Sequence, residues 1–263
     1  MELASGKLVR DEPADGVVRL RIANPERRGA LDHEILDTLA ETVAGLDARC
    51  LVLTGTGPVF SAGYDLGNLE GREFEESAEK LVAHPFHAAL EALEAFPFPV
   101  IGQINGHAIG GGLELALTCD IRLAAEGVRV GMPPAKLGLI YSHTGLRKFL
   151  DVCGPAVTAE LFYVGRNVDA ERALAVGLLN HVVADDELEE LTVGMAGEIA
   201  ANAPLSLSGN KRILRELRHH AAALPEDVGR DLVDLRESCF RTEDFREGVR
   251  AFAEKRPPAW QGR

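Results

Sequence analysis

The chain has 263 residues, of which 46% are hydrophobic and 26% charged, and this composition is typical of a globular protein. Its formal net charge of -13 argues against nucleic acid as a partner, because a nucleic-acid site needs a basic face. No apolar stretch reaches the roughly 20 residues of a bilayer span, and the start of the chain lacks a signal-peptide pattern, so we expect no membrane partner. The four cysteines form no CxxC pair, which predicts no metal site and a cytoplasmic protein.

The first half of the chain alternates apolar runs with helical patterns. Residues 17–22 alternate apolar and polar side chains, residues 50–54 are continuously apolar, and both patterns predict strands. Asp32 stands where it can cap a helix. That helix would bury one apolar face, made of Ile35, Leu36, Leu39 and Val43. Residues 86–96 carry a second helical pattern, and residues 98–104 read as another buried strand.

The second half begins with strands and ends with helices. We expect strands at 120–125 and 128–131, a loop at 132–145, and a last short strand at 182–183. Helices are expected between the loop and that last strand, at residues 146–152, 155–163 and 170–176. From Glu187 onward the pattern is helical almost to the end. The whole order predicts an α/β core with a helical C-terminal part.

The stretch Asn105–Asp120, NGHAIGGGLELALTCD, carries the strongest chemical signal. Three glycines, Gly110 to Gly112, stand between a predicted strand and a predicted apolar helix. The first N–H groups of a helix have no intrahelical partner, and glycines let a ligand approach them. Glu114 lies in the first turn, so the stretch offers donors for a developing negative charge beside a proton carrier. The alternative is a glycine-rich turn before a buried helix, with Glu114 only complementing the helix dipole.

Five segments in order resemble the enoyl-CoA hydratase/isomerase, or crotonase, superfamily. Besides NGHAIGGGLELALTCD they are NPERRGALD near Asn24, FSAGYDL at 60–66, RALAVGLLNHVV at 172–183 and the C-terminal EGVRAFAEKRPPAW. The resemblance covers nearly the whole chain. It implies an α/β fold, with a crotonase-like spiral of ββα units and an acyl-CoA site over residues 1–199. It also implies a C-terminal helical trimerisation region over residues 200–263, and a homotrimer or a hexamer made of two trimers.

The resemblance assigns roles to particular residues. The backbone N–H groups of Tyr64 and Gly111 would form an oxyanion hole for a thioester enolate, with Glu114 as the acid–base group. Coenzyme A is then part of the substrate, and no separate cofactor is expected. The residues implied in binding it are Arg27, Arg28, Ala30, Ala62, Asp65, Leu66, Phe252 and Lys255, the last two reaching across a subunit interface. Many family members carry a lysine at the place of Gly67, so one cation is missing here.

The loop after residue 131 bears on the reaction. Hydratases of the family hold the attacking water between two glutamates, and single-glutamate isomerases also use the second position. The second position is Pro134 in this chain, and proline cannot exchange a proton. The loop sequence MPPAKLGLIYSHTGL instead resembles that of methylmalonyl-CoA decarboxylase-like members, in which a tyrosine at the place of Tyr141 faces the active site. Those decarboxylases tend to carry histidine where Tyr64 stands.

Three hypotheses follow. The first is a lyase of acyl-CoA and fatty acid metabolism that decarboxylates a malonyl-type CoA thioester, with Glu114 or Tyr141 protonating the α-carbon. The second is an enoyl-CoA hydratase or isomerase that works with Glu114 alone. The third is an inactive acyl-CoA-binding homologue, against which the intact glycines and Glu114 argue.

Overall fold

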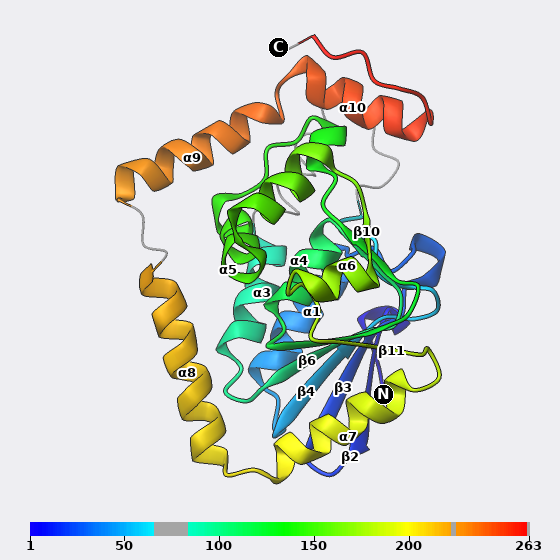
Figure 1. The fold of residues 1–263 in the computed structure, drawn as a ribbon, viewed down its shortest axis with the longest axis vertical. Coiled ribbons are helices and arrows are strands. Elements are labelled where there is room, and N and C mark those ends of the chain that lie inside the picture. The colour runs from blue at the N-terminus through cyan, green and yellow to red at the C-terminus, as the bar shows by residue number, and fades with distance from the viewer. Residues whose placement is uncertain (66–83, 222–224, 262–263) are drawn as a thin grey trace.

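The computed structural model describes residues 1–65, 84–221 and 225–261, and Figure 1 shows their arrangement. The strands are β1 (Glu2–Leu3), β2 (Leu8–Ala14), β3 (Val17–Ile22), β4 (Cys50–Thr54), β5 (Val59–Ser61), β6 (Val100–Ile104), β7 (His107–Ile109), β8 (Ile121–Ala125), β9 (Arg129–Gly131), β10 (Val168–Asp169) and β11 (His181–Val183). The helices are α1 (His33–Ala44), α3 (Pro85–Ala95), α4 (Gly111–Thr118), α5 (His143–Ala159), α6 (Ala170–Ala175), α7 (Leu188–Ala201), α8 (Pro204–Ala221), α9 (Glu226–Cys239) and α10 (Glu243–Ala253).

The strands form two sheets. The larger has seven strands in the order β1-β2-β3-β4-β6-β8-β11, and the smaller has four in the order β10-β9-β7-β5. From β3 to β11 neighbouring strands of the larger sheet run parallel. β4 and β6 are buried along their whole length, as expected of parallel strands covered on both faces.

Each repeat of two strands along the chain adds one strand to each sheet. β4, β6 and β8 enter the larger sheet, and the strands that follow them, β5, β7 and β9, pair in parallel in the smaller one. A helix follows β7 and β9. This repetition is the predicted spiral of ββα units, so the predicted α/β fold class is confirmed. The repetition matters for the site because it stacks the ends of β5, β7 and β9 in one layer.

Most predicted elements are found where the patterns placed them. Asp32 caps α1, its Oδ1 accepting a hydrogen bond from the N–H of Ile35 at 2.9 Å. The loop expected at 132–145 is wrong in two respects. Residues Pro134–Leu137 form a 3₁₀ turn, and α5 already begins at His143 because Ser142 caps it. The two helices expected at 146–152 and 155–163 are confirmed: both lie within the span of α5, but the backbone at Gly154, with a φ of 72° and a ψ of 173°, is not helical and separates them, and the second continues into the π-turn Glu160–Val164.

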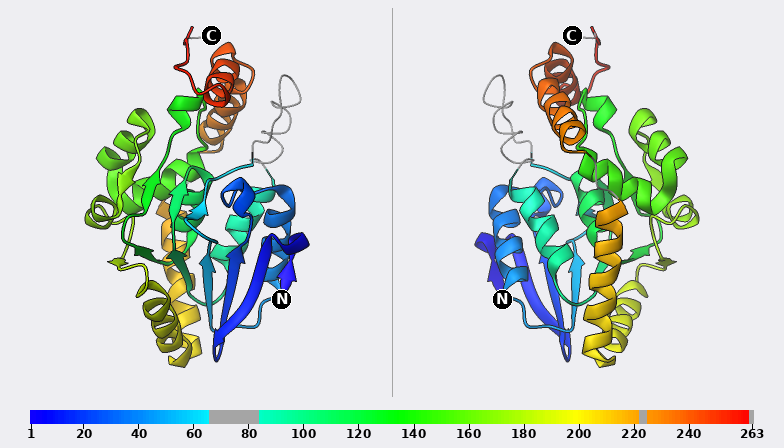
Figure 2. Two further views of the ribbon diagram at one scale, coloured as in Figure 1. Left: turned by 90° about the vertical axis from the view of Figure 1, so that its right-hand side faces the viewer. Right: turned by 90° about the vertical axis from the view of Figure 1, so that its left-hand side faces the viewer.

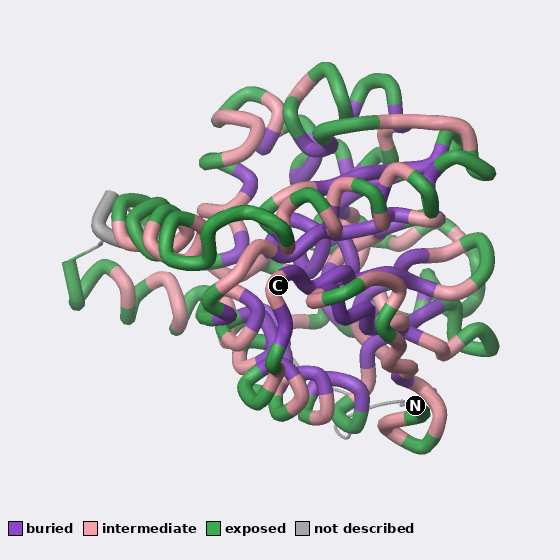
Figure 3. The backbone as a smooth tube through the Cα atoms, turned by 90° about the horizontal axis from the view of Figure 1, so that it is seen from below, coloured by how far each residue is buried: buried purple, intermediate pink, exposed green. Residues whose placement is uncertain are grey.

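The C-terminal helices occupy the outside of the molecule. Figure 2 shows α9 and α10 over the end of the core where α5 lies, while α8 runs along its side. Figure 3 shows buried residues concentrated in the core, and mostly exposed or intermediate residues along α8 and α9. The helical tail predicted from Glu187 onward is therefore confirmed as α7 to α10. The division of the chain at residue 199 stays a prediction; α7 ends at Ala201 and α8 begins at Pro204.

Candidate active site

A turn after β5 positions the first predicted oxyanion donor. The N–H of Leu31 donates to the carbonyl of Gly63 at 2.8 Å, and the N–H of Asp65 donates to the carbonyl of Leu31 at 2.9 Å. Leu31 and Tyr64 thus form an isolated parallel bridge. In such a bridge the intervening residue bonds to nothing on that side, so the Tyr64 N–H points away from Leu31. It has no hydrogen-bond partner within the described parts of the chain.

The second donor begins α4. Gly110 has a φ of 58° and turns the chain into the helix, while its own N–H donates to the carbonyl of Gly131 at 2.9 Å. Gly111 is then the first helical residue, and its N–H has no intrahelical partner. A Cβ placed on Gly63 would lie 3.0 Å from the nitrogen of Gly111. The two donor segments therefore touch, as an oxyanion hole requires.

Close backbone packing locks these segments together. A Cβ on Gly112 would lie 2.3 Å from the carbonyl oxygen of Ser61, a distance that no side chain tolerates. The Ser61 hydroxyl donates to the carbonyl of Gly29 at 2.8 Å and accepts from the N–H of Gly63 at 3.2 Å. Gly112 is thus required for the close approach of α4 to β5. The sequence pattern alone did not distinguish this packing role of Gly112 from the donor role of Gly111.

Glu114 and Tyr141 meet beside the two donors. Glu114 is 3% exposed, and its Oε2 accepts a hydrogen bond from the hydroxyl of Tyr141. Burial raises the pKa of the Glu114 carboxyl, and this effect exceeds the lowering by the Tyr141 hydrogen bond and by the charge of Lys148. Burial likewise raises the pKa of the Tyr141 phenol. Glu114 therefore holds its proton at a higher pH than an ordinary glutamate does.

Tyr64 contributes a side chain as well as a donor. Its ring lies over α4, where a Cβ on Gly111 would come within 3.1 Å of its Cζ. Its hydroxyl interacts with that of Tyr141, and burial followed by the charge of Glu114 raises its pKa. The two tyrosines and Glu114 thus form one chain of polar groups in otherwise apolar surroundings.

Aromatic rings surround this polar chain. Tyr64 packs edge-on against Phe86 with ring centroids 4.8 Å apart, and Tyr141 packs against Phe162 at 5.4 Å. Phe162 in turn packs against the buried Phe149 of α5. These contacts fix both tyrosine rings.

The predicted coenzyme A residues fall into two groups. The first group borders the Tyr64 turn, because the N–H of Ala62 donates to the carbonyl of Arg28 at 3.1 Å. Arg27 forms an ion pair of 3.8 Å with Asp65, and both arginines are exposed. Ala30 is buried in the same segment, next to Leu31. The structure thus brings together four predicted binding residues and Ala62, whereas Leu66 and Gly67 lie outside the described residues.

The second group is Phe252 and Lys255, at the end of α10. Phe252 is 73% exposed, and Lys255 is exposed with a φ of 53°. Within the described residues no hydrogen bond or ion pair joins them to the Arg27 segment. The expectation that these two residues bind coenzyme A across a subunit interface stays a prediction.

Sequence reasoning missed two residues that hold the site. Gly145 stands in the first turn of α5, and a Cβ there would lie 2.5 Å from Cε1 of Tyr141 and 3.0 Å from Oε1 of Glu114. Cys239, at the end of α9, donates to the carbonyl of Gly138 at 2.8 Å and accepts from the N–H of Ile140 at 3.3 Å. Gly145 could have been noticed in the sequence as a glycine close to Tyr141. No local sequence pattern connects Cys239 to residues about a hundred positions earlier.

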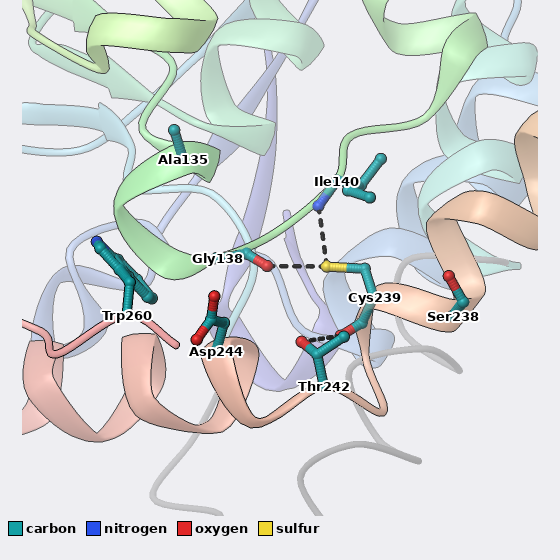
Figure 4. Close-up of a pocket in the computed structure, with 8 residues that line it drawn as sticks. All are labelled: Ala135, Gly138, Ile140, Ser238, Cys239, Thr242, Asp244 and Trp260. Atoms are coloured by element: carbon teal, nitrogen blue, oxygen red, sulfur yellow. Dashed lines mark hydrogen bonds between the residues drawn. The ribbon is translucent and has the colours of Figure 1, made fainter. Parts of the chain in front are cut away.

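A hollow of about 400 Å³ lies next to these contacts (Figure 4). It is lined by residues of the 134–140 segment and of α9, α10 and the tail, namely Ala135, Gly138, Ile140, Ser238, Cys239, Thr242, Asp244 and Trp260. None of the predicted catalytic residues lines it. Figure 4 shows the Cys239 sulfur pointing at the loop backbone, so this thiol is engaged in holding the loop.

No helix in the described part of the chain has the length and apolar character of a membrane span. The sequence model of the enoyl-CoA hydratase/isomerase family matches residues 12–263.

Three known proteins illustrate the similarity. The chain is 34% identical over 251 residues to the putative enoyl-CoA hydratase/isomerase YngF of Bacillus subtilis (strain 168), an alignment that covers 92% of this chain and 94% of the relative. It is 32% identical over 240 residues to methylmalonyl-CoA decarboxylase of Escherichia coli (strain K12), covering 89% and 90% of the two chains. A solved structure of methylmalonyl-CoA decarboxylase in complex with 2-nitronate-propionyl-CoA superposes with a TM-score of 0.88 at 29% identity, over 98% of this chain and 99% of that one. The chain belongs to the enoyl-CoA hydratase/isomerase family.

Proposed function

We propose that the protein is a lyase that decarboxylates a malonyl-type coenzyme A thioester. The observation that carries this proposal is the hydrogen bond between Tyr141 and the buried Glu114 beside the two backbone donors. A carboxyl whose pKa is raised by burial is better suited to give a proton to carbon than an ordinary glutamate. The similarity to methylmalonyl-CoA decarboxylase in sequence and fold adds support.

The proposed reaction needs no base. The bond between the α-carbon and the carboxylate breaks, its electron pair forms the thioester enolate, and carbon dioxide leaves. The N–H groups of Tyr64 and Gly111 stabilise the enolate oxygen, and such a donor contributes roughly 3–4 kcal/mol in a well-studied enzyme. Glu114 then protonates the α-carbon, and solvent returns a proton to its carboxylate.

The residue at the position of the family's second acidic group supports the same reaction. Pro134 is buried at the start of its 3₁₀ turn, and its carbonyl accepts from the N–H of Leu139 at 2.9 Å. No carboxylate stands at this position to activate a water molecule opposite Glu114. Hydration of a double bond would therefore lack a group that typically contributes 10²–10⁴-fold.

The second candidate is an enoyl-CoA hydratase or isomerase that uses Glu114 alone. The specific observation in its favour is that a glutamate stands in the first turn of α4, beside the two donors. Similar proteins named as hydratases, such as the probable enoyl-CoA hydratase echA6 of Mycobacterium leprae at 32% identity, add to it. An inactive acyl-CoA-binding homologue is disfavoured because Glu114, the glycines and the packing around them are intact.

We also propose a homotrimer or a pair of trimers, acting in the cytoplasm. α8 carries several large apolar side chains on its surface, among them Leu205 at 86% exposure, together with Ile213, Leu214 and Leu217. An apolar row on an outer helix is a surface that a second copy can cover. The four cysteines are unpaired, in keeping with a reducing compartment. Light scattering that shows a monomer at micromolar concentration would contradict the trimer.

The experiment that tests the reaction is a substrate screen with mass analysis of the products. Malonyl-, methylmalonyl-, ethylmalonyl- and crotonyl-CoA are incubated separately with the full-length protein. We expect loss of carbon dioxide from at least one malonyl-type thioester and very slow addition of water to crotonyl-CoA. Fast hydration together with no decarboxylation would make the hydratase the better reading.

A further inference from the structure

The last turn of α9 is fastened to the loop that carries Tyr141. Besides the two Cys239 contacts, Phe240 packs edge-on against Phe245 at 5.2 Å, and Leu139 packs against this pair. A Cβ on Gly138 would lie 2.8 Å from the carbonyl oxygen of Asp244, so helix α10 also abuts the loop. The inner face of α9 near its end, which carries Cys239, therefore packs against the loop that leads to Tyr141.

Arg236 lies on that inner face. Its helical neighbours three and four positions away are Leu232, Val233, Cys239 and Phe240, all of them buried or half-buried. The acidic residues Asp231 and Asp234 are exposed, and the half-buried Glu237 is the adjacent residue, which does not face Arg236 on the helix. Arg236 itself is half-buried, so the aliphatic part of its side chain lies against these apolar neighbours.

The guanidinium of Arg236 has no hydrogen-bond or ion-pair partner in the described portion of the structure. Other half-buried cations do have one: Lys148 binds Glu94, and Lys211 binds Asp120 at 2.8 Å. The positive charge of Arg236 nevertheless reaches the site, because it opposes the rise that burial causes in the pKa of Tyr64. A cation near the site that has no partner among the described residues is available to bind an anionic group of a ligand.

We propose that Arg236 is a specificity-determining residue that binds a free carboxylate on the acyl group of the substrate. The site as described holds hydroxyls, backbone donors and the carboxyl of Glu114. Two cations act on these groups: Lys148, which is paired with Glu94, acts on Glu114, and Arg236 acts on Tyr64. The substrate class is therefore a coenzyme A thioester with a second, negatively charged carboxyl group. This inference rests on the proposed function and names the residue that recognises its substrate.

The expected kinetic effect has a definite direction. Arg236 meets the full charge of the carboxylate in the bound substrate, whereas in the transition state that charge moves onto the enolate oxygen at the other donors. An interaction that is stronger in the ground state lowers KM and does not raise kcat. Loss of Arg236 should therefore raise KM for a malonyl-type thioester by about tenfold to a hundredfold and leave kcat unchanged or slightly higher.

The test compares two stable thioethers, 2-carboxypropyl-CoA and propyl-CoA, which differ only in the carboxylate. Dissociation constants are measured by calorimetry for the full-length protein and for Arg236→Gln, Arg236→Lys and Arg230→Gln. Arg230 is an exposed arginine of the same helix and serves as the matched control. We expect the unmodified protein to prefer the carboxylate ligand, Arg236→Gln to lose about tenfold or more of that preference, Arg236→Lys to keep part of it, and Arg230→Gln to keep all of it.

Two results would overturn the inference. One is a full preference for the carboxylate ligand in Arg236→Gln, and the other is equal weakening of both ligands, which would assign Arg236 to coenzyme A or to folding. Because binding is measured without turnover, the proposed function is tested separately. If no malonyl-type thioester is decarboxylated but Arg236→Gln alone loses the preference, carboxylate recognition stands and the reaction is wrong.

Discussion

The hydroxyl of Tyr141 donates a hydrogen bond to Oε2 of Glu114, although the two residues stand 27 positions apart on different elements. Glu114 comes from the first turn of α4, and Tyr141 from the segment before α5. α4 supplies one backbone donor and the acid, and the loop supplies the group that orients the acid. This hydrogen bond joins the glycine-rich stretch that contains Glu114 to the loop that contains Tyr141, and the proposed reaction depends on both.

Replacing Tyr141 with phenylalanine should lower decarboxylation about tenfold to a hundredfold while coenzyme A binding stays nearly unchanged. The change removes one hydroxyl and so one hydrogen bond to a buried carboxyl, at the acyl end only. Steady-state kinetics and calorimetry with free coenzyme A check the two halves of this prediction. An unchanged kcat/KM would show that the hydroxyl takes no part in the reaction.

Gly145→Ala should reduce activity without unfolding the protein. The new Cβ would lie 2.5 Å from the ring of Tyr141, so the ring must move away from Glu114. Gly194→Ala in α7 is the matched control, because its Cβ meets nothing within 4 Å. The control should keep full activity and gain up to about 1 kcal/mol of stability. If Gly145→Ala is as active as the control, the position of the Tyr141 ring does not matter.

The raised pKa of Glu114 makes stability depend on pH. The folded protein binds this proton more tightly than the unfolded chain, so the benefit is complete below the ordinary glutamate pKa and is lost as pH rises toward the folded pKa. Glu114→Gln removes this loss. The free energy of unfolding of the variant should therefore gain on that of the unmodified protein by up to about 1.4 kcal/mol per pH unit as pH rises through the window, and its melting temperature should rise relative to that of the unmodified protein in the same window. Parallel curves would place the Glu114 pKa in its ordinary range.

Pro134→Glu should raise the hydration of crotonyl-CoA from its very low level. The substitution restores a carboxyl at the second acid position, where general acid–base groups contribute 10²–10⁴-fold. Because Pro134 is buried, the new carboxyl should also lower the melting temperature. Absorbance at the enoyl thioester band follows the reaction. Hydration that is already fast before the substitution would remove the argument from Pro134.

Local patterns were sufficient for the elements near the donors. The alternation at 17–22, the apolar run at 50–54 and the glycines before α4 each specify an element without help from distant residues. Tyr64, Gly111, Glu114 and Tyr141 were predicted to share a site through the family resemblance, and the structure does bring them together. The hydrogen bond between Tyr141 and Glu114 could not be predicted from the sequence.

Long-range packing set the features that were not predicted. The sequence gives no sign that Leu31 holds the Tyr64 turn, because the bridge depends on how two loops meet. The start of α5 was misplaced because the segment up to Gly145 was read as loop, whereas Ser142 caps the helix by accepting a hydrogen bond from the N–H of Gly145 at 3.0 Å. Arg236 lies in a helix of alternating charges, and only the packing of α9 on the loop distinguishes it from the exposed arginines.

The central claim is that the protein forms a thioester enolate by losing carbon dioxide and then protonates it on carbon. Methylmalonyl-CoA turnover in deuterium oxide, followed by mass analysis of the propionyl-CoA and the released gas, tests it most directly. The account predicts one deuterium at the α-carbon for each carbon dioxide released, with the rate reduced in Tyr141→Phe. Intact methylmalonyl-CoA, beside rapid conversion of crotonyl-CoA to its 3-hydroxy product in the same preparation, would contradict it.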